Sequence, residues 1–293
     1  MRDVAIVGGG PAGLAAALVL GRARREATVF DVAPARNASA ENVRGFLTRD
    51  GTPPAALRKI AHEELRSYPT IEVREQCVET IEPAGRGFRV DPQREMFRRV
   101  LLCVGIRDRV PTLYRALWGT RVLQCPYCHA YEVADRAYAF LATKPADLDH
   151  ALLLRAWTKD VVLLASFPLD DVQRDRLARA QIRIERRPLR IVEAADDDGV
   201  RLRFDDGDLV RDRLFAHPPQ CQTELVEQLK LAVDQHDVVK VDEHYETSVP
   251  GIHAAGDLMT RVHSAQFAAG NGAAAAYAVN YAVTLERVVD GSL

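Results

Sequence analysis

The stretch that decides the fold is VAIVGGGPAGLAAALVL, residues 4–20. Residues 4–7 form a compact apolar run with β-branched side chains, which is typical of a buried parallel strand. Residues 8–13 follow the G-x-G-x-x-G pattern, whose glycines allow a tight turn, a close approach of backbone to pyrophosphate, and close helix–strand packing. An apolar helix is expected from Leu14 to Leu20. The stretch therefore predicts a strand, a turn and a helix whose N-terminus binds a dinucleotide.

Outward from this turn, a second strand is expected at residues 27–30, and it ends in Asp31. Its carboxylate follows Gly13 at the distance where such folds bind a ribose hydroxyl. The alternative is a purely structural turn in which the aspartate only caps a helix, but all four features would then have to coincide. The combination favours a dinucleotide site.

The other end of the chain carries a second group of small residues. Residues 250–257 read PGIHAAGD, a strand that ends on Gly256 and Asp257, and this aspartate can accept hydrogen bonds from a ribityl hydroxyl. Residues 263–283 are rich in alanine, which lets a helix pack closely on a neighbour or a cofactor. If its first turn faces a flavin, the helix dipole stabilises negative charge on the reduced ring. An ordinary tight contact between two helices is the alternative.

The central motif CPYCHAYE, residues 125–132, contains the only close cysteine pair. A structural zinc site needs four ligands, and the remaining cysteines at positions 77, 103 and 221 are too scattered to supply them, so no metal is expected. Two intervening residues allow Cys125 and Cys128 to form a disulfide at a helix start, where N–H groups and the dipole lower a thiol pKa. The motif therefore predicts a redox-active pair.

His129 follows this pair directly. Histidine titrates near neutrality, so it is a candidate acid/base for thiol exchange, with Glu132 one helical turn away as a possible orienting group. A solvent-facing or structural histidine is the alternative.

Together these segments resemble the flavoprotein disulfide reductases, and more closely the low-molecular-weight, bacterial-type thioredoxin reductases. CPYCHAYE resembles the CPYCHGYE-type members, which include dithiol oxidases acting on gliotoxin, holomycin and romidepsin, although Ala130 stands where that pattern has glycine. The resemblance implies an α/β fold with two Rossmann-like domains: a discontinuous FAD domain at residues 1–117 and 243–293, and a central domain at residues 118–242. It also implies a homodimer.

The resemblance further implies the roles of individual residues. Cys125 would exchange with substrate and Cys128 would face the flavin, while His129 stands where thioredoxin reductases proper usually have an aspartate. Cys103 would occupy a structural turn. The residues expected to bind FAD are Gly8, Gly10, Pro11, Ala12, Gly13, Asp31, Gly105, Gly256, Asp257, Ser264 and Ala265.

The central domain should hold a second dinucleotide site for NADPH, but its turn is changed. Residues 142–147 read ATKPAD and contain no glycine, so each residue brings a Cβ where bare backbone is needed. Pro145 removes an N–H donor, and Asp147 would repel a phosphate. Asp170 and Asp171 stand where the family has a basic cluster. We therefore expect a degenerate site that does not use NADPH in the usual way.

Composition narrows the possible partners. The chain has 293 residues and a net charge of −2, which gives no electrostatic reason to expect nucleic acid or an anionic membrane. An uncharged run at residues 4–21 is interrupted by glycines and proline, so neither a membrane span nor a signal peptide is expected. The five cysteines, with one close pair, fit a cytoplasmic protein.

These observations lead to one main hypothesis and two alternatives. The main hypothesis is an FAD-dependent oxidoreductase that oxidises a dithiol, either a small molecule or a small redox protein, and passes electrons through FAD to O₂ or another acceptor. The second is a thioredoxin reductase-type disulfide reductase that receives electrons from atypically bound NADPH or from ferredoxin. The third is a non-enzymatic flavin redox sensor.

Overall fold

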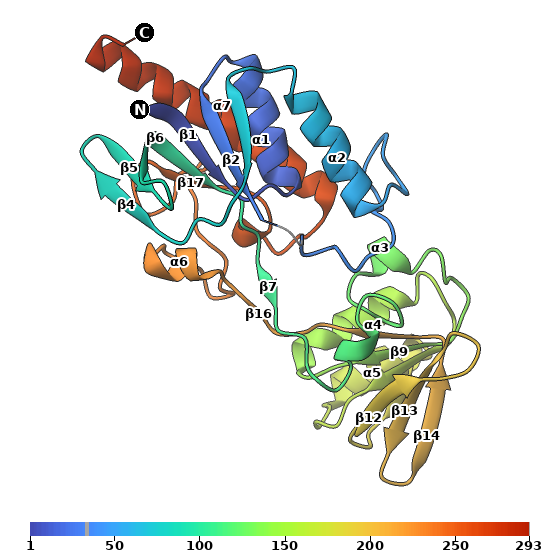
Figure 1. Cartoon of the computed structure of the whole chain (residues 1–293). Helices are drawn as coiled ribbons and strands as arrows, with labels where there is room; N and C mark the ends of the chain where they lie inside the picture. Colours follow the sequence, from blue (N-terminus) through green and yellow to red (C-terminus); the bar gives the residue numbers. More distant parts are fainter. Residues whose placement is uncertain (33–34, 293) are drawn as a thin grey trace. The chain divides into compact units, whose positions relative to one another are not determined.

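The computed structural model describes residues 1–32 and 35–292, and the chain divides into two compact units (Figure 1). The first unit consists of Met1–Arg107 and Gln220–Leu293, and the second is Asp108–Pro219. Two short strands where the chain crosses between the units, β7 (Arg107–Asp108) and β16 (Gln220–Cys221), pair with each other.

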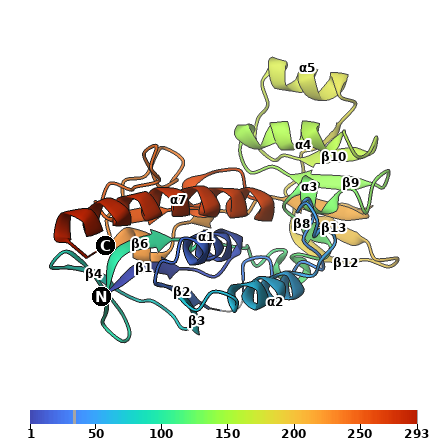
Figure 2. The same ribbon diagram turned by 90° about the horizontal axis from the view of Figure 1, so that it is seen from above.

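The first unit is built on a seven-stranded sheet flanked by helices (Figure 2). Strand β6 pairs in parallel with β1 and β17, and antiparallel with β5. The sheet order, with β17 beside β6, is β3 (Ile71–Glu75), β2 (Ala27–Asp31), β1 (Arg2–Val7), β6 (Glu95–Leu102), β5 (Gly87–Val90), β4 (Ile81–Ala84), and β17 (Ile252–Ala254). The main helices are α1 (Pro11–Arg22), α2 (Pro54–Leu65), α6 (Glu224–Gln228) and α7 (Ala265–Asp290).

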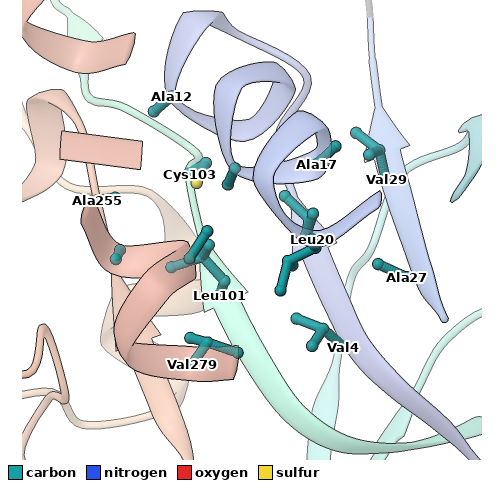
Figure 3. Close-up of a cluster of buried hydrophobic side chains, with 14 of the residues drawn as sticks. Val4, Ala12, Ala17, Leu20, Ala27, Val29, Leu101, Cys103, Ala255 and Val279 are labelled. Carbon is teal, nitrogen blue, oxygen red and sulfur yellow. The ribbon is translucent and has the colours of Figure 1, made fainter. Parts of the chain in front are cut away.

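One core of this unit lies between the sheet and the pair α1 and α7 (Figure 3). Leu20 of α1 and Val279 of α7 pack with Val4 and Leu101 of the sheet, and all four are fully buried. The helices approach closely because Gly272 of α7 stands against the backbone of α1, where a Cβ would overlap a carbonyl group. The alanine-rich segment therefore forms a helix that packs tightly on α1. This is the contact between two helices that was the alternative expectation for this segment.

The second unit contains a five-stranded parallel sheet and a three-stranded antiparallel sheet. The parallel order is β11 (Arg183–Glu185), β10 (Val161–Leu164), β9 (Tyr138–Leu141), β15 (Arg213–Ala216) and β8 (Val122–Leu123). The antiparallel strands are β12 (Ile191–Ala194), β13 (Val200–Phe204) and β14 (Gly207–Arg211), and each consecutive pair forms a hairpin. Its helices are α3 (Pro126–His129), α4 (Leu148–Leu154) and α5 (Asp171–Arg179), with short 3₁₀ turns at η1 (Arg115–Leu117) and η2 (Pro145–Asp147).

The α/β class expected from the sequence is confirmed, but the unit boundaries differ from residues 117/118 and 242/243. Leu225 and Val239 are buried in a core of the first unit, so the segment after residue 219 belongs there. Leu113 and Leu117 pack on a core of the second unit. Burial decides these boundaries; Pro218 and Pro219 stand directly at the second one and were the available signal in the sequence.

Candidate functional site

The glycine turn between β1 and α1 is close-packed on one side and open on the other. A Cβ on Gly8 would overlap the carbonyl of Cys103, and one on Gly13 would overlap the carbonyl of Gly8. Gly10, in contrast, faces open space, with no surrounding atom of the described residues within 4 Å of a Cβ placed there. No described side chain caps α1, and its first turn carries no acid. The N–H groups at this helix start are therefore available to an anionic ligand.

Asp31 ends β2 and is buried beside this turn, with its carboxyl group against Gly9. Two side chains of α2 reach the carboxylate: Arg58 forms an ion pair with it, and Nε2 of His62 lies 3.5 Å from its Oδ2. Arg58 and His62 were not predicted as site residues from the sequence. Their spacing of four residues on a helix was the available signal, because it places both on one face.

A cavity of about 950 Å³ opens beside this cluster, in the first unit. Asp31, Arg58 and His62 line it together with Pro54 and Glu75. It runs along β3, from Ile71 to Glu75, and reaches Asp31 at the carboxyl end of β2, the edge where α/β sheets bind ligands. Its volume falls in the range of cofactor sites. The cavity extends the site that begins at the glycine turn.

The C-terminal residues of the expected cofactor site lie in the same unit. Gly256 follows β17 with a φ of 86°, in the left-handed region that favours glycine. Asp257 forms an ion pair with Arg36 at 2.9 Å. The hydroxyl of Ser264 accepts a backbone N–H of the first turn of α7 at 3.0 Å, so this side chain caps the helix, and Ala265 is the first helical residue.

Cys103 and Gly105 lie in the turn after β6. Cys103 is buried, and this burial raises the pKa of its thiol, so the side chain is an uncharged part of the core. Gly105 follows with a φ of 64°.

Cys125 and Cys128 form a disulfide at the start of α3, with Cα atoms 5.3 Å apart. Cys125 is the extended N-cap residue directly beyond β8, and Pro126 occupies the first turn, where its missing N–H costs nothing. Tyr127 packs edge-to-face on Trp157, with ring centroids 5.4 Å apart, and this contact holds α3 against the segment after α4. The disulfide therefore lies at the carboxyl edge of the parallel sheet of the second unit.

His129 is the last residue of α3. Its Nδ1 lies 3.3 Å from the carbonyl oxygen of Cys125, so the ring folds back over the turn that carries the disulfide. The expectation that Glu132 lies one turn further along the same helix is wrong, because Ala130 already caps the helix.

The corresponding turn of the second unit, between β9 and α4, is filled by its own acid. Oδ2 of Asp147 accepts the N–H of Thr143 at 2.8 Å, the hydroxyl of Thr143 at 2.9 Å, and the N–H of Lys144 at 3.1 Å. The sequence analysis expected this carboxylate to repel a phosphate. In the structure it also satisfies the backbone donors that a phosphate would use.

Two histidines that the sequence analysis did not single out lie at the same sheet edge. His217 follows β15 and packs against His150 of α4, with ring centroids 4.1 Å apart and the ring planes tilted by 39°. Burial lowers the pKa of His217 to about 4, His150 and Lys144 lower it further by smaller amounts, and Asp147 and Asp108 act in the opposite direction. The ring is therefore neutral at neutral pH.

Known proteins with similar sequences indicate the family of this chain. Residues 170–272 match the family model "Pyridine nucleotide-disulphide oxidoreductase". The thioredoxin reductase tcpT of Claviceps purpurea is 30% identical, with 87% of this chain and 86% of that protein covered. The thioredoxin reductase sirT of Leptosphaeria maculans is 29% identical, with 95% and 93% covered.

A solved structure described as HlmI has a TM-score of 0.92 with 34% identity, covering 99% of this chain and 95% of that one. The chain belongs to the thioredoxin reductase-like family.

This thioredoxin reductase-like protein is an FAD-dependent oxidoreductase that acts on disulfides. The residues of the first unit fit FAD, because the uncapped start of α1, the open space at Gly10 and the adjoining cavity supply N–H donors and volume for a dinucleotide. Within the described residues there is no group of three or more His, Cys, Asp or Glu side chains suited to a metal ion. Nor does any described helix have the length and apolar character needed to cross a membrane.

The low pKa of His217 makes the stability of this thioredoxin reductase-like protein pH-dependent. Between pH 6.5 and about 4 the unfolded chain binds a proton at this histidine and the folded protein does not, so stability falls as pH falls through this window. The difference amounts to about 3 kcal/mol once the pH has fallen below both pKa values. We expect His217→Gln to remove this part of the pH dependence in urea unfolding curves.

The matched control is His236→Gln, which replaces an exposed histidine of the first unit. Its unfolding curves should keep the wild-type dependence on pH. Parallel slopes for His217→Gln and wild type from pH 6.5 to 4 would show that His217 titrates normally.

Proposed function

We propose that this protein oxidises a dithiol substrate at the Cys125–Cys128 disulfide and does not draw electrons from NADPH in the usual way. The proposal depends mainly on the hydrogen bonds of Asp147. Its carboxylate accepts the donors of the turn that would otherwise bind the pyrophosphate of NADPH.

The two turns of the chain differ in the property that matters for phosphate binding. In the first unit, the start of α1 has no capping side chain and no acid, and Gly10 leaves open space. In the second unit, Asp147 takes the N–H groups of Thr143 and Lys144, and Pro145 offers none. A phosphate there would have to displace a buried carboxylate that already accepts three hydrogen bonds. This contrast supports an FAD site in the first unit and argues against an NADPH site in the second.

The segment after β10 supports the same conclusion. Asp170 caps α5 by accepting the N–H of Gln173 at 2.7 Å, so an acid stands where a basic residue would bind a 2′-phosphate. Arg174, the nearest cation in the chain, is bound to the carbonyl of Leu169 and to the carboxylate of Asp171.

The chain's own residues supply the thiol chemistry of the proposal. A substrate thiolate attacks Sγ of Cys125, and the disulfide breaks with its electron pair on Cys128. His129 takes up and returns the thiol proton, which suits an imidazole close to the Cys125 turn. The second substrate thiol then attacks the sulfur joined to Cys125, and the substrate leaves as a disulfide. FAD, when bound, supplies the two-electron acceptor, which O₂ or another acceptor reoxidises.

The test is anaerobic stopped-flow absorbance of the flavin with each donor alone. Dithiothreitol, a small dithiol, should bleach the flavin rapidly. NADPH at equal concentration should do so at least about 10²-fold more slowly, because a donor without its own site loses the benefit of positioning. Steady consumption of O₂ with dithiothreitol should then accompany multiple turnovers in air.

Other outcomes point to the alternatives. Rapid bleaching by NADPH, or by reduced ferredoxin, would contradict the proposal and favour a disulfide reductase fed by that donor. Bleaching by dithiothreitol without repeated turnover under any acceptor would favour a redox sensor.

We also propose that the protein is a homodimer, as the family resemblance implies. An exposed apolar stripe on α7, formed by Tyr277, Tyr281, Leu285 and Val288, supports a second copy as the partner. Sedimentation velocity measures the mass of the assembly.

A further inference from the structure

The contacting rings of His150 and His217 have no part in the thiol chemistry of Cys125, Cys128 and His129. Both rings also pack against Phe140, with centroids 5.9 Å and 5.8 Å from it. Nδ1 of His150 and Nε2 of His217 are buried and have no hydrogen-bond partner among the described residues. Buried polar atoms are nearly always hydrogen-bonded in native proteins, so these two nitrogens indicate a place where another group binds.

The strand order places His217 and the disulfide at the same edge of the sheet. In the parallel pair β15 and β8, Phe215 lies opposite Leu123. His217 comes directly after β15, and Cys125 comes two residues after β8. Because the two strands are adjacent and parallel, both residues lie at the carboxyl edge of this sheet.

The His217 side chain lies on the face of the sheet that α4 covers. Leu123, Phe140 and Phe215 belong to one buried cluster on that face, together with residues of α4. The contacts of His217 with Phe140 and with His150 of α4 place its ring beside this cluster. Ala130, which follows the disulfide turn, belongs to the same cluster.

We propose that His217, supported by His150, is the second thiol-binding group of the redox site and makes it selective for small dithiols. Its Nε2 accepts the S–H of the second substrate thiol while the first thiol forms a mixed disulfide with Cys125. This inference rests on the proposed function and adds a residue and a substrate class to it.

The step balances within the site. The second substrate thiol attacks the substrate sulfur that is bonded to Cys125, forming the substrate disulfide and releasing the Cys125 thiolate. The proton of that thiol passes through the His217 ring to the Cys125 thiolate. The substrate thus loses two electrons and the protein disulfide gains them, with Cys128 already reduced in the first attack. No further reactant is required.

The charged and titratable groups around the pair determine the form in which it acts. His150 lies on α4, Asp147 and Lys144 on the preceding turn, and Asp108 on β7, and all four act electrostatically on His217. Because burial keeps the pKa of His217 low, its ring is uncharged under working conditions and Nε2 remains able to accept. It holds the proton only while the new disulfide forms.

The test follows the reductive step in the holoenzyme under anaerobic conditions, by rapid alkylation and intact-mass measurement. The variants are His217→Phe, which keeps a stacked ring without nitrogens, and His150→Phe, with His236→Gln as an exposed control. With dithiothreitol, the mixed disulfide of His217→Phe should accumulate because its resolution slows about 10²-fold, the contribution typical of a positioned base. His150→Phe should slow the resolution of the mixed disulfide by a smaller factor. His236→Gln should resolve it at the wild-type rate.

Two further readouts separate this role from a packing effect. The first attack by β-mercaptoethanol, a monothiol, should proceed at the wild-type rate in His217→Phe. In His217→Phe, the rate at which the mixed disulfide is resolved should rise about tenfold per pH unit from pH 6 to 8, because it follows the thiolate fraction of the second substrate thiol. In the wild type this rate should rise less steeply.

Equal resolution rates in wild type and His217→Phe would overturn the inference, as would an equal slowing of the monothiol reaction. If wild type itself failed to exchange with dithiothreitol, the proposed function would be wrong instead, so the two failures are distinguishable.

Discussion

Replacing Cys125 with serine should abolish dithiol oxidation while leaving the flavin bound. A serine hydroxyl cannot form the mixed disulfide with substrate, and thiol–disulfide exchange has no other route to the disulfide partner. Cys125→Ser should therefore show no turnover above the rate of buffer with free FAD. Cys128→Ser should also be inactive, but its remaining Cys125 thiol should be able to form a stable mixed disulfide with an oxidised substrate. Oxygen consumption and intact-mass measurements check the two outcomes.

The matched control is Cys77→Ser, an exposed cysteine of the first unit that forms no disulfide. This variant should retain the wild-type rate. All three variants should keep the flavin absorbance, because the glycine turn belongs to the first unit and the disulfide to the second. Turnover in Cys125→Ser would contradict the assignment of the redox centre and favour a role that does not depend on this disulfide.

Replacing Gly272 with valine should destabilise the first unit strongly and reduce its flavin content. A Cβ at this position would lie 2.0 Å from the backbone carbonyl oxygen of Ala12, in the first turn of α1. Backbone cannot rotate away as a side chain can, so α7 and α1 must separate. Overpacking of this kind costs about 3 kcal/mol or more. Urea unfolding and the absorbance ratio of flavin to protein measure the two effects.

Gly270→Ala on the same helix provides the control. No surrounding atom of the described residues lies within 4 Å of a Cβ placed there. Alanine should therefore stabilise α7 by about 1 kcal/mol through its higher helix propensity. Equal stability of the valine and alanine variants would show that α1 and α7 do not depend on this close contact.

Much of this protein can be predicted from its sequence where short-range patterns are sufficient. The apolar run, glycine turn and helix at residues 4–20 are found as expected, because strand and turn preferences are properties of neighbouring residues. The Cys125–Cys128 disulfide at a helix start follows from its spacing and from Pro126. The altered turn at residues 142–147 was visible as a missing glycine, although not as a turn that Asp147 satisfies from within.

Other features could not be predicted because they join residues that are distant in the chain. Arg58 reaches Asp31 only because α2 packs beside the end of β2. The division after Arg107 and Pro219 depends on where segments bury their leucines and valines.

The sequence alone thus determined the local chemistry: a dinucleotide turn, a cysteine pair that forms a disulfide, and a second turn without glycine. Only the tertiary structure placed His217 at the same sheet edge as the cysteine pair and brought its ring against His150. The reason is that strand register and helix packing set which side chains share an edge of a sheet. These depend on the burial of the whole core and not on any short stretch of residues.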